Sequence, residues 1–348
     1  MPARPTRLLD RPTPLPGAGA DALSEVLRTI RLTGALFFRV EAAFPWCASA
    51  PAGASLAGHV FPGAEQIVSF HVVTEGSCWV AAEGGPETRL EAGDVVVFPH
   101  GDAYALSTRR GAWPPPDLAF FRRMSQGQLP FTIRDGGSGP PRLQVLCGFL
   151  SCDAQPFNPL LVTLPRVMVV RRSVDDGSRL RQLTELARSE ASQVRAGTAC
   201  VLSRLSELLF IEAVREHASR VSSTDTGWFA GLRDPGVGRA LTLLHQSPGR
   251  RWKLERLARE AGLSRTGLVD RFTRLIGEPP IQYLTRWRMQ MAAQHLAESD
   301  EKVSSVARRV GYDSEAAFSR VFKKWVGVPP GQWRRKTSRS WRRRTSEK

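Results

Sequence analysis

Cysteine is scarce in this 348-residue sequence, and its pattern limits the class of protein. The five cysteines stand at positions 47, 78, 147, 152 and 200, an odd number without a C-x-x-C pair. This argues against a disulfide framework and favours reduced, mostly buried thiols. We therefore expect a cytoplasmic protein.

Long apolar runs are also absent. No uninterrupted stretch approaches the length of a membrane span, so we expect no membrane partner. The opening twenty residues are rich in Arg, Pro and Gly and lack the hydrophobic segment of a signal peptide. Residues 1–20 are expected to be a disordered N-terminal segment.

Lysine does not occur before Lys253, and the basic charge of the chain is concentrated in its last third. Residues 227–348 contain 26 lysines and arginines against 11 acidic residues, whereas residues 1–226 contain 23 against 22. A solvated helix face would explain a single run of basic residues. It does not explain a surplus of positive charge over the whole of residues 227–348 when residues 1–226 are nearly neutral. The C-terminal region is therefore expected to bind a polyanion.

A repeat with a period of fifty residues lies within this basic region. The segment Phe272–Tyr283 reads FTRLIGEPPIQY and Phe322–Trp333 reads FKKWVGVPPGQW, so aromatic, glycine, proline and glutamine positions coincide. Duplication of this length indicates one supersecondary unit used twice.

Each copy has the pattern of two helices joined by a tight turn. Gly262 and Gly311 suit the end of a first helix, while Ser264, and either Asp313 or Ser314, can cap a second. The proline pairs 279–280 and 329–330 are expected to stop the second helices. Such a unit could be any αα corner, but the charge favours a DNA-binding helix-turn-helix.

The residues between the copies are predicted to form one helix, from Ile281 to Glu298. Its apolar side would consist of Ile281, Leu284, Trp287, Met291 and Leu296. At ~1.5 Å per residue this is a rod of roughly 25 Å. Such a rod is compatible with two recognition helices near the ~34 Å spacing of successive major grooves.

The segment Trp252–Arg335 resembles the DNA-binding domain of the AraC/XylS transcriptional regulators. The resemblance rests on Gly311-Tyr312, on the run SEAAFSRVF that begins at Ser314, and on the GVPPG that begins at Gly327. It implies two helix-turn-helix units, each placing its second helix in a major groove, with double-stranded operator DNA and RNA polymerase as partners. The groove-facing residues that it implies are Arg265, Thr266, Val269 and Asp270 in the first unit and Glu315, Ala316, Ser319 and Arg320 in the second; Arg271, Lys323 and Lys324 complete the expected DNA-binding set.

Two of these side chains suggest specific contacts. Arg320 could bind guanine O6 and N7 bidentately, and Glu315 could accept from cytosine N4. The alternatives are a phosphate contact for Arg320 and, for Glu315, a first-turn acid that complements the helix dipole. Asp270 occupies the position equivalent to Arg320, where the family often has a basic residue. We therefore expect the second unit to dominate affinity at some operators, while the first tunes specificity.

The first half of the chain has many short strand-like runs. The predicted strands are Ala35–Val40, Gln66–Thr74, Cys78–Ala82, Asp94–Phe98 and Leu143–Leu150, with turns rich in Gly, Pro and Asp between them. This pattern predicts a sandwich or barrel. The segments 70–79 and 93–102 resemble the paired motifs of a cupin barrel, and more specifically the cupin-type sensor that precedes some AraC-like domains.

The cupin resemblance implies a pocket for a small-molecule effector, lined by Phe70, His71, Trp79 and Tyr104. Cupins often bind a metal, but the first motif offers only His71 and Glu75, and Tyr104 stands where the metal-binding form has histidine. His100, Cys47 and Cys147 could substitute, although their spacing does not require it. We expect a hydrogen-bonded barrel histidine at position 71, with no metal and no other cofactor.

Residues 178–219 change to helical spacing, with Gly197 between two apolar stripes. Two antiparallel helices would either dimerise the protein or pack on their own barrel.

The predicted domains are the disordered segment 1–20, the sensor 21–170, the helical linker 171–226, the DNA-binding domain 227–335 and the basic tail 336–348, with Ser222–Thr226 as a flexible link. Seven basic residues between Arg334 and Arg344 would add salt-sensitive phosphate contact.

The sequence thus predicts an α+β multidomain protein: a cupin-like β-barrel, a helical linker or dimerisation region, and an all-α domain with two helix-turn-helix units. Its predicted function is that of a bacterial, ligand-responsive, homodimeric transcriptional regulator and not of an enzyme. The main alternative is a metal-dependent cupin isomerase or dioxygenase with a nucleic-acid-binding appendage. A third is an architectural DNA-binding protein with a vestigial barrel.

Overall fold

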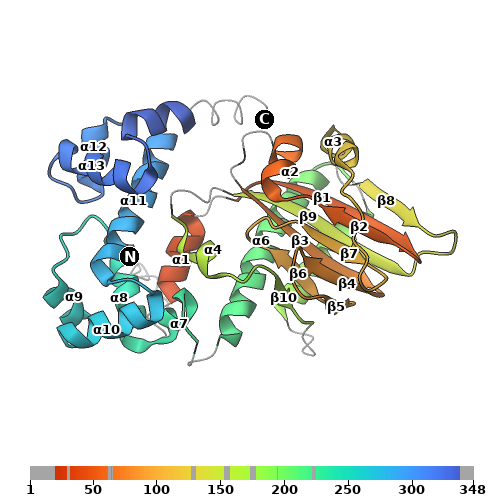
Figure 1. The fold of residues 1–348 in the computed structure, drawn as a ribbon, viewed down its shortest axis with the longest axis horizontal. Coiled ribbons are helices and arrows are strands. Elements are labelled where there is room, and N and C mark those ends of the chain that lie inside the picture. Colours follow the sequence, from red (N-terminus) through yellow and green to blue (C-terminus); the bar gives the residue numbers. More distant parts are fainter. Residues whose placement is uncertain are drawn as a thin grey trace, which may run out of the picture.

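The computed structural model describes residues 20–29, 32–61, 64, 66–126, 131–152, 157–172, 178–193, 195–221 and 225–337. Within them a β-rich body and an all-helical body lie side by side, with helices α1 and α4 between the two (Figure 1). The predicted disordered segment up to residue 19, most of the Ser222–Thr226 link and the basic tail from residue 338 lie outside the described residues.

The β-rich body consists of two facing sheets. The larger sheet has the strand order β10-β6-β3-β9-β1-β8 and the smaller has the order β2-β7-β4-β5. The strands are β1 (Leu32–Ala43), β2 (Cys47–Ala50), β3 (Gln66–Glu75), β4 (Ser77–Ala82), β5 (Thr88–Glu91), β6 (Val95–Phe98), β7 (Tyr104–Ser107), β8 (Phe131–Gly136), β9 (Leu143–Cys152) and β10 (Met168–Val170). Pairing is antiparallel except between β1 and β8. The described strands of the two sheets are not hydrogen-bonded to one another, so the predicted barrel is an open, cupin-like sandwich.

The larger sheet is covered on both faces over its central strands, which explains why β3, β6 and β9 are apolar at most positions. In β3 the residues from Ile67 to Val73 are all buried. Because side chains alternate across a strand, Val68, Phe70 and Val72 belong to the core on the helical side, whereas Ile67 and Val73 belong to the core between the sheets.

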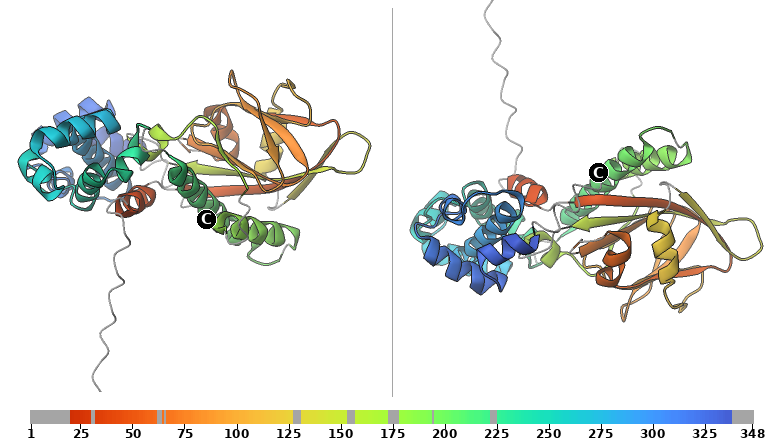
Figure 2. Two further views of the ribbon diagram at one scale, coloured as in Figure 1. Left: turned by 90° about the horizontal axis from the view of Figure 1, so that it is seen from below. Right: turned by 90° about the horizontal axis from the view of Figure 1, so that it is seen from above.

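Six helices accompany the sheets, and the longest covers the outer face of the larger sheet (Figure 2). They are α1 (Ala20–Thr29), α2 (Gly53–Val60), α3 (Leu118–Gln126), α4 (Pro159–Thr163), α5 (Arg179–Ser192) and α6 (Thr198–Arg220). Helices α5 and α6 pack on each other around Gly197, whose φ of +88° suits glycine. The predicted helical pair is therefore present, and α6 lies on its own sheet.

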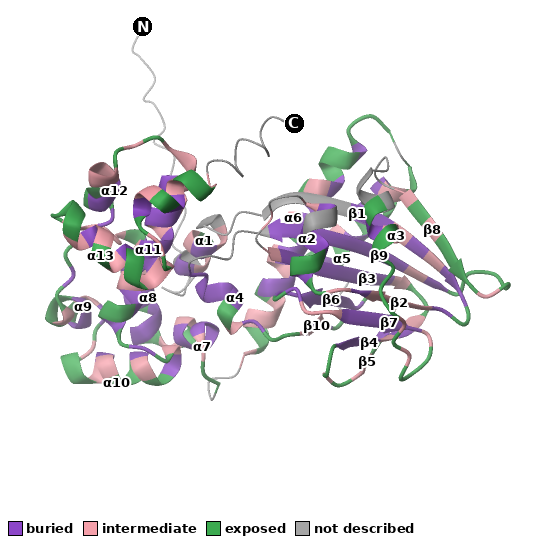
Figure 3. Cartoon of the chain, turned by 45° about the horizontal axis from the view of Figure 1, so that its top comes forward, coloured by how far each residue is buried: buried purple, intermediate pink, exposed green. Residues whose placement is uncertain are grey.

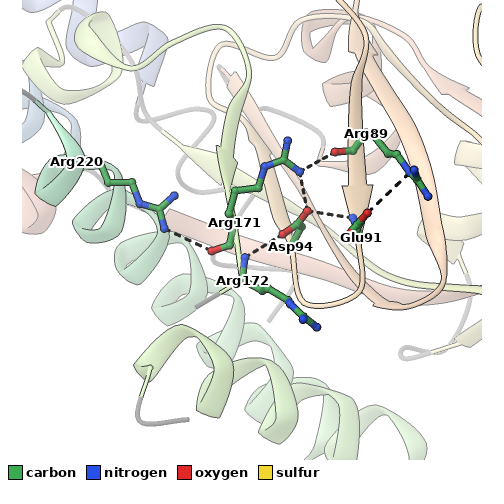
Figure 4. Close-up of polar contacts among 6 residues, drawn as sticks. All are labelled: Arg89, Glu91, Asp94, Arg171, Arg172 and Arg220. Atoms are coloured by element: carbon green, nitrogen blue, oxygen red, sulfur yellow. Dashed lines mark hydrogen bonds and ion pairs between the residues drawn. The ribbon is translucent and has the colours of Figure 1, made fainter. Parts of the chain in front are cut away.

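A buried carboxylate fixes the edge of the sheet near the C-terminal end of α6. Asp94 accepts hydrogen bonds from the backbone N–H groups of Glu91 (3.0 Å) and Arg172 (2.9 Å) and pairs with Arg171 (2.8 Å). Arg220 of α6 donates to the backbone carbonyl of Arg171 (Figure 4). The acid of the second cupin-like motif thus has a structural role.

The helical body contains the fifty-residue repeat. Its helices are α7 (Trp228–Arg233), α8 (Pro235–Gln246), α9 (Leu254–Glu260), α10 (Arg265–Ile276), α11 (Pro280–Glu298), α12 (Val303–Arg309) and α13 (Glu315–Val326), followed by helical residues 330–337. Helices α9 and α10 form the first helix-turn-helix unit and α12 and α13 the second, with α11 between them. The predicted architecture is confirmed in both copies.

Two details of the sequence interpretation are wrong. Helices α10 and α13 end at Gly277 and Gly327, which adopt left-handed φ values of +88° and +86°. Pro280 is instead the first residue of α11, where its missing N–H has no cost. Ile281 is 38 % exposed and does not belong to the buried side of α11.

Both helix-turn-helix units contain buried residues (Figure 3), and these belong to two different cores. The second unit has its own cluster, which includes Leu296, Val306, Phe318, Phe322 and Trp333. The core of the first unit is continuous with apolar residues of the sensor side, namely Ala22, Val26, Phe157, Leu160, Leu161 and Leu164. The sensor is therefore joined to the first unit by apolar packing. The core of the second unit instead includes residues from the C-terminal half of α11.

Candidate DNA-binding surface and inter-sheet cavity

Both recognition helices begin at a serine cap, as the sequence predicts. The Ser264 hydroxyl accepts from the backbone N–H of Gly267 (3.0 Å), and the Ser314 hydroxyl accepts from that of Ala317 (3.3 Å). A serine cap satisfies a backbone donor that the helix leaves free. Of the two caps considered for the second helix, Ser314 is therefore the one used.

The predicted DNA-binding side chains lie on accessible faces of α10 and α13. Arg265, Thr266, Asp270 and Arg271 are exposed and Val269 is half-buried; in the second unit Glu315, Ala316, Arg320, Lys323 and Lys324 are exposed and Ser319 is half-buried. Leu268, Phe272, Phe318 and Phe322 occupy the buried sides. The first predicted set of DNA-binding residues thus lies on α10, and the second lies on α13.

The two recognition helices carry opposite charges at the equivalent positions 270 and 320, and they differ in ion pairing. Arg265 pairs with Glu255 (3.4 Å), and Arg271 lies 3.9 Å from a carboxylate oxygen of Asp234. Asp270 and its repeat counterpart Arg320 form no ion pair with any described residue. The acid on the first helix is thus not neutralised by Arg271, and the guanidinium on the second is available to a ligand.

Arg288 of α11 fixes one side of the contact between the two units. It donates to the backbone carbonyls of Pro248 (2.7 Å) and Arg250 (2.8 Å), and its guanidinium faces the ring of Tyr312 at 5.8 Å. Arg251 pairs with Asp313 across the same contact. The loop before the first unit is thereby tied to the turn of the second.

Arg286, also on α11, fixes the other side and reaches the sensor. It pairs with Glu278 (2.9 Å), a residue only 8 % exposed that follows α10. Its guanidinium carbon lies 3.9 Å from the ring centroid of Phe157 and 5.7 Å from that of Trp325 on α13. We call Phe157, Glu278, Arg286 and Trp325 the junction.

Phe157 enters the junction from the sensor, directly before α4. Its backbone N–H donates to the buried side-chain oxygen of Gln290 (2.9 Å), and its ring lies edge-on to Tyr283 at 5.9 Å. Asn158 then caps α4 through the backbone N–H groups of Leu160 and Leu161. Sequence reasoning missed this contact, because no periodicity links positions 157 and 290.

A buried polar group stabilises the core of the first unit. The Tyr283 hydroxyl lies 2.8 Å from the indole nitrogen of Trp228, which donates to it, and 2.7 Å from Nε2 of His245. Burial lowers the pKa of His245 to about 3. Burial likewise lowers the pKa of His71, in the sensor, to about 3.

These two histidines predict acid sensitivity. Unfolding restores a pKa of about 6.5, so the unfolded state binds more protons between about pH 6.5 and pH 3. Their contribution to stability is complete above about pH 6.5 and is lost as the pH falls toward 3, at up to ~1.4 kcal/mol per histidine per pH unit. Denaturant unfolding at pH 7.5 and 5.5 measures this. His245→Gln should flatten the dependence; an equal slope in the variant would contradict the assignment.

A cavity of about 420 Å³ lies between the two sheets. Its apolar wall includes Phe38, Val40, Trp46, Leu106, Phe120, Phe121, Ile133 and Phe149. His71 and Tyr104 are its most buried polar residues, each 3 % exposed, and Nε2 of His71 lies 2.8 Å from the Tyr104 hydroxyl. Burial also raises the pKa of Tyr104, so both side chains are uncharged at neutral pH.

The structure separates the four residues predicted to line one pocket. His71 and Tyr104 line the inter-sheet cavity, but Phe70 does not, because neighbouring residues of a strand point to opposite faces. The Phe70 ring packs against Gly148 and Phe37 on the helical side. Trp79 lies on the outer face of the smaller sheet, beneath the guanidinium of Arg110 at 5.0 Å.

Of the residues considered for a metal site, His71, Cys47 and Cys147 line the inter-sheet cavity, whereas Glu75 and His100 do not. Glu75 is exposed and accepts from Gln144, while His100 hydrogen-bonds the backbone carbonyl of Leu164. Within the described ranges, no three His, Cys, Asp or Glu side chains are grouped closely enough to hold a metal ion. In the same part of the chain, no helix is both long and apolar enough to cross a membrane.

Comparison with known proteins agrees with both halves of the fold. Residues 21–219 match the family described as Cupin, and residues 257–336 match the family described as Helix-turn-helix domain. The cupin match extends through α5 and α6 and thus covers most of the predicted linker; the domain limits drawn from the sequence stay predictions.

Relatives match along most of the chain. A protein of Streptomyces lividans described as an AraC-like transcription regulator is 31 % identical over 78 % of this chain and 88 % of its own length. One of Streptomyces antibioticus with the same description is 33 % identical over the same shares. The HTH-type transcriptional regulator AlkR of Acinetobacter baylyi is 25 % identical over 91 % of this chain and its whole length. These relatives are transcription regulators, which overturns the enzyme alternative, and the chain belongs to the AraC-like regulators, with an N-terminal cupin domain and a C-terminal DNA-binding domain.

Proposed function

We propose that this AraC-type regulator responds to a small molecule in the inter-sheet cavity, and that the segment 157–164 links the cavity to DNA binding. The observation that carries the proposal is the path of β9. Its residues Cys147 and Phe149 line the cavity, and the chain then continues to Phe157 in the junction. A ligand acts by favouring one relative arrangement of the two helix-turn-helix units over another. It can shift the population between two arrangements only if it binds them with unequal affinity.

The proposed DNA contacts follow from charge and exposure. Arg320 is proposed to bind a guanine and Glu315 a cytosine of one operator element, with Lys323 and Lys324 on phosphates. In the other element Asp270 is proposed to accept from a cytosine amino group, since no described basic residue pairs with it. Arg265, Thr266, Val269, Arg271, Ala316 and Ser319 complete the proposed contact set.

We also propose a homodimer through α5 and α6. The inward side of α6 is used by its own sheet, yet Leu186, Val201 and Leu208 on the pair remain 51 %, 41 % and 45 % exposed. A second copy of the same apolar face would cover them in a two-fold interface. Leu208→Asp should convert a dimer to a monomer in sedimentation velocity at equal concentration. A monomeric wild type, or a dimer unaffected by the substitution, would exclude this interface.

Operator affinity with and without ligand tests the effector proposal. DNA selected from random sequence by the full-length protein would serve as the operator, and its dissociation constant would be measured with and without crude metabolite extract. We expect a several-fold change, which Ala48→Trp should abolish because Ala48 lines the cavity and a tryptophan there would fill it. The matched control is Trp79→Ala, on the outer face. Unchanged affinity together with unchanged promoter output would contradict the proposal.

A further inference from the structure

The inter-sheet cavity has a chemical character that restricts its occupant. Five aromatic rings, those of Phe38, Trp46, Phe120, Phe121 and Phe149, contribute to its wall. Ligand sites commonly combine such a wall with a small number of placed polar groups, and a volume of about 420 Å³ lies within the usual range for a small molecule. The identity of the polar groups then decides the class of ligand.

Positive charge is not available to an anion inside this cavity. His71 is neutral because burial lowers its pKa to about 3. Among the described lining residues, the one arginine or lysine is Arg134, which is exposed and pairs with Glu41 at 3.0 Å. Asp117 and Asp135 are the other charged lining residues. A carboxylate or phosphate would thus be placed in this cavity without a cationic partner, which disfavours binding.

One polar atom of the His71–Tyr104 pair has no partner among the described residues. Nδ1 of His71 is buried and has no hydrogen-bond partner among the described residues, whereas Nε2 is engaged by Tyr104. A neutral imidazole carries one N–H, so Nδ1 is left either as a donor or as an acceptor, depending on the tautomer. A hydroxyl placed beside the pair suits either tautomer, because it can both donate and accept, and the Tyr104 hydroxyl that bonds Nε2 lies in the same lining.

We propose that the cavity binds an uncharged, largely apolar molecule that carries a hydrogen-bonding group such as a hydroxyl, placed against the His71–Tyr104 pair. The inference rests on the proposed function, in which this cavity is the effector site. It excludes carboxylates and phosphates as effectors and favours alcohols or phenols with an aliphatic or aromatic body.

A displacement assay on the full-length protein tests the ligand class. The probe is the uncharged fluorophore N-phenyl-1-naphthylamine, and the competitors are 1-octanol and octanoate, which share a chain length and differ in charge. At pH 7.5 we expect octanol to displace the probe at a concentration at least about 10-fold lower than octanoate. Tyr104→Phe, which removes only the hydroxyl, should weaken the binding of octanol by about 3- to 10-fold and leave the affinity for the probe unchanged.

Two variants separate the possible failures. Ala48→Trp should abolish probe binding while circular dichroism shows an unchanged fold, and Trp79→Ala should bind as the wild type does. If octanoate competes as well as octanol or better, the ligand class is wrong while the cavity remains the effector site. If the probe does not bind, or binds Ala48→Trp as tightly as the wild type, both the ligand class and the cavity as effector site are wrong.

Discussion

Arg320→Ala should weaken operator binding by about 5- to 150-fold, because a bidentate arginine–guanine contact is worth about 1–3 kcal/mol of discrimination. The guanidinium is exposed on α13 and forms no ion pair with a described residue, so the substitution leaves no buried partner behind. The measurement is the dissociation constant for the selected operator and for an unrelated duplex at fixed salt. We expect the loss to fall on the operator alone.

Two further variants distinguish a base contact of Arg320 from a phosphate contact. Arg320→Lys retains the charge but not the planar pair of donors, so base recognition predicts a loss close to that of alanine. A phosphate contact instead predicts that lysine is tolerated and that alanine weakens both duplexes equally. Arg142→Ala, which removes an exposed arginine from the β-rich body, is the matched charge control. Intact binding by Arg320→Ala combined with abolished binding by Asp270→Ala would reverse the roles assigned to the two units.

Phe157→Ala should destabilise the first helix-turn-helix unit and disconnect it from the sensor. The ring is 6 % exposed and lies between Tyr283 and Arg286. Removal of a buried phenylalanine ring typically costs about 3–5 kcal/mol. We expect a loss at the lower end of this range in denaturant unfolding, since Phe157 lies at the margin of the core. The backbone N–H to Gln290 does not depend on the side chain.

The functional part of this prediction concerns communication. If Phe157 carries the sensor state to α11, operator affinity in Phe157→Ala should no longer respond to occupancy of the cavity. Phe44→Ala is the control, because Phe44 is 42 % exposed and belongs to the same β-rich body. A variant that is destabilised but responds to ligand as the wild type does would show that the junction is structural only.

The local features of the DNA-binding domain were predictable because they depend on residues close in sequence. Ser264 and Ser314 cap their helices as expected, and the buried sides of α9, α10, α12 and α13 follow the 3.6-residue period. The proline pairs were misinterpreted because the preceding glycines already end the helices in the left-handed conformation. Proline at the start of the next helix produces the same sequence signal as proline after the end of one.

The sensor was predictable in part. The five predicted strands are present, whereas β2, β5, β7, β8 and β10 were missed. Four of these have only three or four residues, and β8 reads FTIRDG, which is largely exposed and has no apolar run. Phe70 and His71 are adjacent in sequence, and only the register of β3 in its sheet shows which of them faces the cavity. The junction was beyond prediction, because Phe157 and Gln290 are 133 residues apart and meet only in the folded chain.

The most direct test of the account is the DNA sequence that the full-length protein selects from a random library. Because Asp270 and Arg320 occupy equivalent positions with opposite charge, we expect two unlike elements, with centres about one helical turn (~10 base pairs) apart. Arg320→Ala should erase the information in one element and leave the other intact. Two identical elements, or a preference that Arg320→Ala does not alter, would contradict it.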